Sequence, residues 1–118
     1  MNREIKFRKW HKELKDMTYS ENVFISFFMT YEKYPDMYEL MQNTGIKDRT
    51  GKDIYQGDIL KSVQETIFLV VWSIERCAFF LQTKEGEIYT LEQYMTPNLW
   101  VESNIYQNPE MIKVAVLN

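Results

Sequence analysis

The sequence is short of the residues from which most metal and catalytic sites are built. It has one histidine, His11, and one cysteine, Cys77, among 118 residues. The usual zinc ligand set needs several such residues and cannot be assembled. A single cysteine cannot form an internal disulfide, so nothing points to an oxidising compartment. We therefore expect no metal and no cofactor.

Long apolar runs are also missing. The longest, residues 67–72, is far shorter than the stretch of about 20 residues that a membrane-spanning helix needs. The first ten residues carry charge but have no apolar core of the kind found in signal peptides. We expect a cytoplasmic protein with no membrane partner.

A strong charge of one sign is lacking as well. The 14 basic and 17 acidic residues give a net charge of −3. Residues 1–15 alone have a net charge of +4, which leaves −7 for the rest of the chain. A basic edge on an acidic body argues against nucleic-acid binding by the whole domain, although it leaves room for a local patch.

No residue pattern predicts catalysis. The phosphate-binding glycine motifs and the G-x-S-x-G nucleophile motif are absent. His11 lies in a polar stretch between charged residues, which is typical of a solvated side chain. Cys77 precedes apolar residues 78–80, a setting typical of a small core filler. We expect that the protein is not an enzyme.

Three aspartates recur at intervals of five residues, Asp48, Asp53 and Asp58, close to Gly51 and Gly57. This spacing suggests a calcium loop at first sight. However, Lys52 lies within the segment, and the closing glutamate of such a loop is missing. Hairpin turns account for the same residues, because aspartate and glycine favour particular turn positions.

The abundant residues favour β-structure. The chain has eight tyrosines, seven phenylalanines and three tryptophans, a residue class that packs well on pleated surfaces. Turn signals recur every 8–12 residues, which is typical of a small barrel or sandwich in one domain. The expected strands are 4–10, 17–20, 23–31, 59–63, 66–73, 78–83, 88–91 and 99–106, with a hairpin within 46–55.

Two segments leave alternatives open. Asp36 followed by Glu39 fits a capping box and one helical turn, but a strand over the same residues 36–42 fits equally well. Asn108 followed by Pro109 resembles a helix start. The apolar tail 111–118 then forms either a last helical turn or a final strand.

The first predicted strand is a candidate nucleic-acid site. Its sequence alternates, which places Lys6 and Arg8 on the face opposite Phe7. With Lys9 and Trp10 it combines cations and an aromatic ring, a mixture that binds single-stranded nucleic acid. An edge strand whose charges prevent aggregation gives the same pattern, and we favour that interpretation.

Aromatic residues elsewhere predict a protein interface equally well. The candidates are Tyr34, Tyr38, Tyr55, Tyr94 and Trp100. In addition, Phe27, Phe28 and the apolar tail offer more hydrophobic surface than a small barrel needs. Self-association is therefore a further expectation.

Three segments together resemble the YopX family of phage and prophage proteins. They are R-E-I-K-F-R-K-W at 3–10, L-M-Q-N-T-G-I-K-D-R-T-G-K-D-I-Y-Q-G-D-I-L-K at 40–61, and N-I-Y-Q-N-P-E-M at 104–111. Two departures occur: Arg8 to His11 read R-K-W-H where the family usually has R-A-W-D, and Ser103 precedes the third segment in place of glycine.

The resemblance implies a phage or prophage origin, a bacterial host cytoplasm and a mainly β fold. It implies a small SH3-like barrel over residues 36–118, preceded by a β-hairpin region over 1–35, with at most one or two short helices. Gly57 and Asp58 fit independently, since many such barrels open a strand with this dipeptide. No catalytic residue is implied. We expect a binding module for a host or phage protein, or alternatively for single-stranded nucleic acid.

Overall fold

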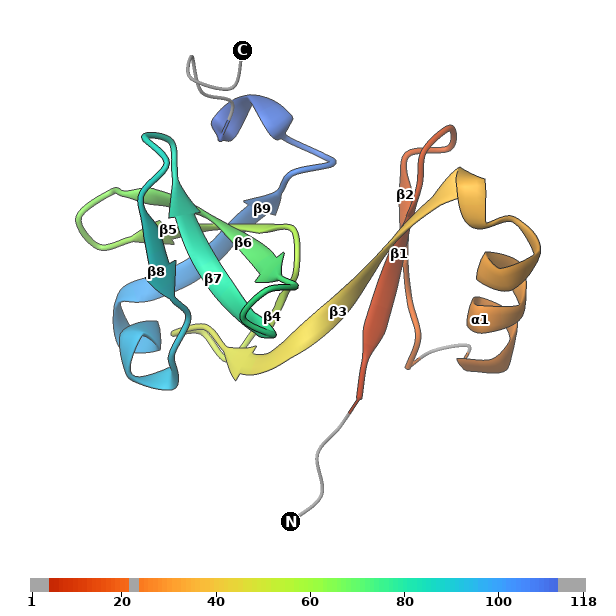
Figure 1. Cartoon of the computed structure of the whole chain (residues 1–118), viewed down its shortest axis with the longest axis horizontal. Helices are drawn as coiled ribbons and strands as arrows, with labels where there is room; N and C mark the ends of the chain where they lie inside the picture. The colour runs from red at the N-terminus through yellow and green to blue at the C-terminus, as the bar shows by residue number, and fades with distance from the viewer. Residues whose placement is uncertain (1–4, 22–23, 113–118) are drawn as a thin grey trace.

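The structure, a computed structural model, describes residues 5–21 and 24–112, apart from the side chains of Phe24 and Tyr94. These residues form nine strands in two antiparallel sheets, one α-helix and three short 3-10 turns (Figure 1). The elements are β1 (Phe7–His11), β2 (Asp16–Tyr19), α1 (Phe24–Lys33), η1 (Pro35–Met37), β3 (Tyr38–Lys47), β4 (Asp53–Tyr55), β5 (Asp58–Ser62), β6 (Ile67–Ser73), β7 (Ala78–Thr83), β8 (Ile88–Thr90), η2 (Gln93–Asn98), β9 (Leu99–Asn104) and η3 (Pro109–Met111).

The expectation of a mainly β protein is confirmed, and β1 and β2 form the predicted N-terminal hairpin. The first sheet has the order β2-β1-β3-β4, and the second has the order β8-β7-β6-β5-β9. The second sheet curls into a half-barrel. Its likeness to an SH3-type barrel stays a prediction.

The strand predicted at 23–31 is wrong, because α1 occupies this segment. A continuous apolar run has the same appearance whether it forms a strand or a helix. In the helix, Phe27 is buried and the ring of Phe28 meets that of Phe7 on β1 edge-on at 5.4 Å. A strand with apolar residues on both faces would need packing partners on both sides. A helix can bury a single apolar face against the small first sheet.

The open alternative at 36–42 resolves into both forms. Pro35–Met37 make a single 3-10 turn, and β3 begins at Tyr38. The predicted capping box is absent: the cap position is Tyr34, which makes no side-chain capping bond, and Glu39 lies in β3.

Strand β3 belongs to both halves of the molecule. Its first part, Tyr38–Gln42, pairs with β1, and its second part pairs with β4. The register shifts between Asn43 and Lys47, where Gly45 has a φ of +84° that suits a bulge. Figure 1 shows β3 running from the hairpin beside α1 to the barrel. The predicted division between residues 35 and 36 stays a prediction.

The barrel encloses the main core. Six residues from six segments form its buried cluster: Ile54, Leu60, Val70, Leu81, Leu91 and Leu99. Except for Ile54 and Leu91, which lie on β4 and just after β8, they come from strands of the curled sheet. Along each strand, side chains that point into this core alternate with side chains that point to the opposite, outward face.

The predicted hairpin turn at 48–51 is confirmed and is held by one buried carboxylate. Asp48 Oδ1 accepts hydrogen bonds from the backbone N–H groups of Thr50 and Lys52, at 2.8 and 2.9 Å. Its Oδ2 accepts from the N–H of Val101 on β9, at 2.8 Å. Asp48 therefore ties the turn between β3 and β4 to the far edge of the second sheet.

Replacing Asp48 with alanine should lower the free energy of unfolding by about 2–3 kcal/mol, because three N–H donors lose a charged acceptor.

Burial raises the pKa of Asp48, but the hydrogen bonds outweigh this effect and hold the pKa below its ordinary value. The carboxylate thus stabilises the fold above about pH 4, and this contribution is lost as the pH falls through the folded pKa. Urea denaturation of the wild type and Asp48→Asn should converge at low pH; a constant difference would contradict this account.

The C-terminal helix start has become a short 3-10 turn, η3, in which Asn108 makes no side-chain capping bond. Residues 113–118 of the predicted tail lie outside the described residues. Within the described ranges, no helix is long and apolar enough to cross a membrane.

Candidate protein-binding groove

The outward face of the barrel sheet carries apolar side chains. Val70 on β6 pairs with Leu81 on β7, and both are buried in the core. Because successive strand residues point to opposite faces, Val71 and its partner Phe80 point outward. Ile88 on β8 has the same orientation, by its pairing with β7. A solvated antiparallel face usually alternates to polar residues, so this face departs from the common pattern.

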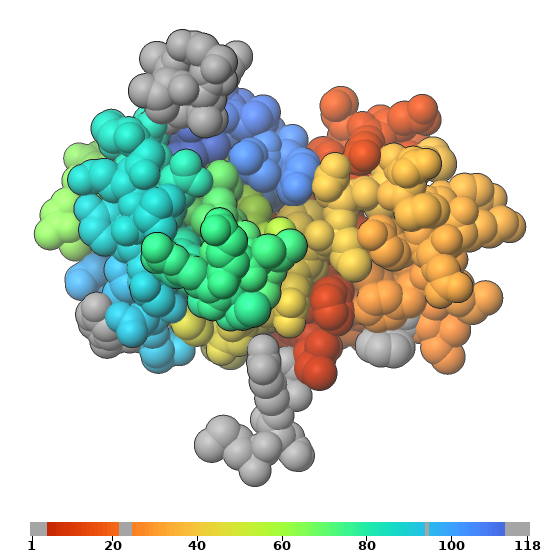
Figure 2. Space-filling model, in the orientation of Figure 1, coloured from red at the N-terminus to blue at the C-terminus, as the bar shows by residue number. Residues whose placement is uncertain are grey.

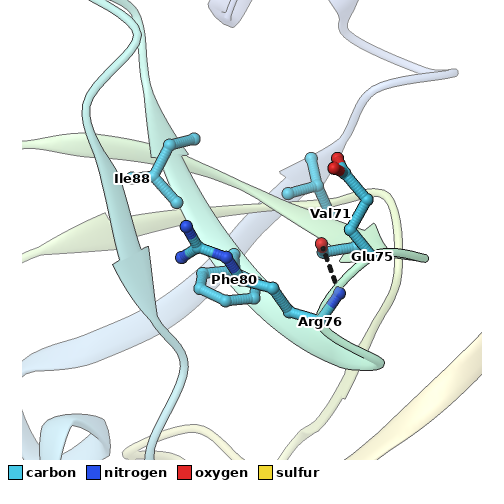
Figure 3. Close-up of a pocket in the computed structure, with 6 residues that line it drawn as sticks. Val71, Glu75, Arg76, Phe80 and Ile88 are labelled. Carbon is cyan, nitrogen blue, oxygen red and sulfur yellow. Dashed lines mark hydrogen bonds between the residues drawn. The ribbon is translucent and has the colours of Figure 1, made fainter.

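These side chains line a groove of about 250 Å³, here called the outer groove. Its lining residues are Val71, Ser73, Glu75, Arg76, Phe80 and Ile88. Figure 3 shows Arg76 lying across Phe80 on the side of Ile88, and Glu75 beside Val71. In Figure 2 the green segment around the β6–β7 turn lies on the face shown, next to the cyan of β7 and β8.

Arg76 shapes the floor of the groove. Its guanidinium carbon lies 5.5 Å from the centre of the Phe80 ring, within range of a cation–π contact. Its backbone N–H donates to Ser73 Oγ at 3.2 Å, which fixes the turn. Neither Arg76 nor Glu75 forms an ion pair with a described residue. Both charges are therefore available to a ligand.

The rim of the groove is also apolar. Ile74 in the β6–β7 turn is 81% exposed, and Ile88 is 50% exposed. Trp72 and Tyr89 are also partly exposed, but they share the face of Val70 and Leu81, on the opposite side of the sheet from the groove. Aromatic residues and arginine are enriched in protein interfaces, and this side of the sheet combines Phe80 and Arg76 with exposed Ile88.

Cys77 is exposed in this turn, so the prediction of a core filler is wrong. Its φ of +49° places it in the left-handed region, at the point where the chain reverses between β6 and β7. The backbone there directs the side chain away from the core. The apolar residues that follow it in sequence begin only with β7.

The predicted edge strand with a solvated basic face is wrong. Strand β1 lies between β2 and β3, and Arg8, Lys9 and Trp10 are only 3%, 4% and 6% exposed. Lys6 is half-buried and pairs with Asp53 at 3.0 Å. The sequence signal failed because the strand's second neighbour, β3, lies about 30 residues further along the chain. The candidate nucleic-acid site thus offers no exposed row of cations.

Arg8 forms a buried ion pair with Asp58, which opens β5. Its Nη2 lies 2.8 Å from Asp58 Oδ1 and donates to the carbonyl oxygen of Gln56 at 3.1 Å. Asp58 Oδ2 accepts from the N–H of Tyr55 at 2.7 Å, and the Tyr55 ring lies under the guanidinium. Burial raises the pKa of Asp58, and the charge of Arg8 opposes this rise.

Lys9 holds the helix onto the sheet. Its Nζ donates to the carbonyl oxygen of Phe27 at 2.6 Å and lies 4.2 Å from the Phe27 ring centre. The ring of Tyr38 is 4.9 Å away on another side. Burial lowers the pKa of Lys9. This lysine is a packing element rather than a surface cation.

The three segments that resemble the YopX family meet in space. Trp10 of the first segment stacks on Tyr106 of the third, with ring centres 6.0 Å apart. Arg8 of the first pairs with Asp58 of the second. Gly57 fits between them at a φ of +87°, where a Cβ would lie 3.0 Å from Met41 Sδ. The segments therefore specify the junction between the hairpin and the barrel.

The predicted protein-binding aromatics do not form one surface. Tyr55 is buried, and burial raises its pKa to about 12. Tyr38 packs against Lys9 and His11. Trp100 is half-buried and donates to Glu102 Oε1 at 2.8 Å. Tyr34 is exposed near α1, and the side chain of Tyr94 lies outside the described residues.

His11 and the three aspartates serve local structure. His11 Nδ1 accepts from the backbone N–H groups of Glu13 and Leu14, at 3.2 and 3.0 Å. Asp48 and Asp58 hold turns, while Asp53 pairs with lysines. Among the described residues, no three His, Cys, Asp or Glu side chains form a group that could hold a metal.

Sequence reasoning missed the outer groove because residues 67–72 are apolar throughout. Such a run gives no alternation from which an outward face can be recognised. A usable signal lay in the pairing with residues 78–83: once Val70 and Leu81 are assigned to the core, Val71 and Phe80 must point outward.

Comparison with known proteins agrees with the fold. The crystal structure of protein EF1440 from Enterococcus faecalis is similar with a TM-score of 0.65 and 20% sequence identity, over 95% of this chain and 100% of that one. At this identity the likeness concerns the fold alone. No curated protein matches the chain. The family model described as YopX protein matches residues 6–113, and the chain therefore belongs to the YopX family.

Proposed function

We propose that this YopX-family chain is a non-enzymatic binding module for a protein partner, and that it acts as a phage or prophage accessory protein on a host or phage protein in the bacterial cytoplasm. The observation that carries the proposal is the outer groove. It joins half-buried Val71 and the Phe80 ring, which Arg76 partly covers and which is 7% exposed, to exposed Ile88, with two charged side chains left for a ligand. Exposed apolar surface of this kind is typical of interaction sites.

We do not favour the alternative of single-stranded nucleic-acid binding. It depended on an exposed strand of cations, but Arg8 and Lys9 are buried and have partners within the fold. A buried guanidinium or ammonium group cannot reach a phosphate without breaking those contacts. We therefore favour a protein partner.

The test compares baits that differ at one exposed residue. Ile88→Asp places a charge in the outer groove, whereas Ile25→Asp makes the same change at a more exposed position on α1. We expect the wild type and Ile25→Asp to capture the same protein from a bacterial lysate. Capture by Ile88→Asp should fall about tenfold, since 1.4 kcal/mol of lost apolar burial is enough for that change.

Quantitative mass spectrometry of the captured proteins gives the measurement. If every captured protein is retained equally by the wild type and Ile88→Asp, the outer groove is not the binding surface. If Ile25→Asp alone loses the partner, the binding surface lies on α1 instead.

A further inference from the structure

Strand β8 is an open edge next to the outer groove. It ends the strand order of the second sheet and pairs only with β7 among the described strands. Its three residues, Ile88, Tyr89 and Thr90, are all exposed and uncharged. Proteins usually protect such edges with charged side chains or proline. Among the described residues, the only protection of this edge is the shortness of β8.

The backbone of β8 presents free hydrogen-bonding groups on its outer side. Flanking residues Glu87 and Leu91 both bond to the β7 side, at 2.9 and 3.2 Å, and Tyr89 shares their orientation. In an antiparallel strand these groups alternate in direction, so those of Ile88 and Thr90 point away from β7. Neither residue has a backbone hydrogen bond to a described residue on that side.

The side chains of the same residues face the outer groove. Ile88 lines it, and Thr90 has the same orientation on the strand. A strand added beside β8 would therefore place every second side chain on the face of the groove, next to Ile88. Backbone pairing at such an edge supplies affinity, and the alternate side chains supply specificity.

Charge restricts the composition of such a segment. Arg76 lies on the β8 side of the groove and has no ion-pair partner among the described residues, so it favours a carboxylate there (Figure 3). Glu87 and Glu92 are exposed just before and after β8. They disfavour further acidic residues at the ends of an added segment and favour lysine or arginine.

We propose that the partner protein binds through an extended segment that joins β8 as an added strand. The segment presents apolar side chains to the outer groove, a central carboxylate to Arg76, and basic residues toward its ends. This inference rests on the proposed function, since it names the partner segment of the same groove. Only Ile88 and Thr90 offer backbone pairs, so side chains in the groove supply much of the affinity.

The test selects binding peptides from a random twelve-residue display library on the whole chain. We expect the enriched peptides to carry a central Asp or Glu and to lose at least about tenfold affinity for Arg76→Glu. Thr90→Pro removes one outward N–H and should weaken binding, whereas Thr90→Val keeps that N–H and should not. In the wild-type chain, bound peptide should slow amide hydrogen exchange at Ile88 and Thr90.

The outcomes separate the inference from the proposed function. Peptides that lose affinity for Ile88→Asp, yet leave exchange at Ile88 and Thr90 unchanged or are indifferent to Arg76→Glu, occupy the groove in another way. They would overturn the added strand and leave the binding module standing. If no peptide is enriched, or if the enriched peptides are indifferent to Ile88→Asp, both the inference and the proposed function are contradicted.

Discussion

Replacing Asp58 with alanine is expected to lower the free energy of unfolding by about 3–5 kcal/mol. The change leaves the buried guanidinium of Arg8 without its carboxylate and the N–H of Tyr55 without its acceptor. Restoring the solvation of a charge at this depth requires opening the junction between the hairpin and the barrel. Urea denaturation followed by tryptophan fluorescence gives the measurement.

Two variants serve as controls for this prediction. Lys12→Ala removes a surface partner of Glu39, in a pair that is about half exposed, and should cost less than about 1 kcal/mol. The double variant Arg8→Met with Asp58→Leu removes both charges and should recover much of the loss. A cost below about 1 kcal/mol for Asp58→Ala would show that the ion pair does not hold the junction.

Trp10→Ala should destabilise the fold by a similar amount, about 3–5 kcal/mol, because it empties a large buried site. Trp10 is buried in β1 and stacks on Tyr106, which follows β9. Its loss therefore removes a contact between two ends of the chain as well as core volume. Thermal unfolding followed by far-ultraviolet circular dichroism measures the effect.

Trp72→Ala is the matched control for Trp10→Ala. Trp72 is partly exposed on β6 and contacts Phe79 at a ring distance of 4.9 Å, so its truncation should cost clearly less. If the two substitutions lower the melting temperature equally, Trp10 has no special role at the junction. If Trp10→Ala alone is severe, the packing of the first and third family segments is supported.

Local features of the fold were predictable from the sequence. The turn at Asp48 and Gly51 was recognised because its hydrogen bonds join residues a few positions apart. The turn at Gly57 and Asp58, together with most barrel strands, was recognised on the same grounds. A turn depends on residues that are neighbours in the sequence, and the alternation of apolar and polar residues in a strand extends over only a few positions.

Features that depend on distant partners were not predictable. Arg8 meets Asp58 fifty positions away, and nothing beside Arg8 indicates that its charge is buried. Lys9 is buried by a helix that the sequence presented as a strand. The expected exposure of the cations on β1 is wrong for this reason, since burial of a cation depends on where its partners fold.

The outer groove was predictable from the sequence only in part. Its strands were predicted closely, but the outward direction of Val71 and Phe80 follows from their register with the core. To predict that β8 is a free edge, one would need the order of all five strands in the sheet. A strand list alone does not distinguish a central strand from an edge.

Amide hydrogen exchange of the chain, with and without the partner that it captures, tests the proposed binding surface most directly. We expect slower exchange on binding over residues 71–80 and 88–90, around the outer groove, with little change in β1, β2 and α1. Protection confined to β2 or α1, with residues 71–80 and 88–90 unchanged, would contradict it.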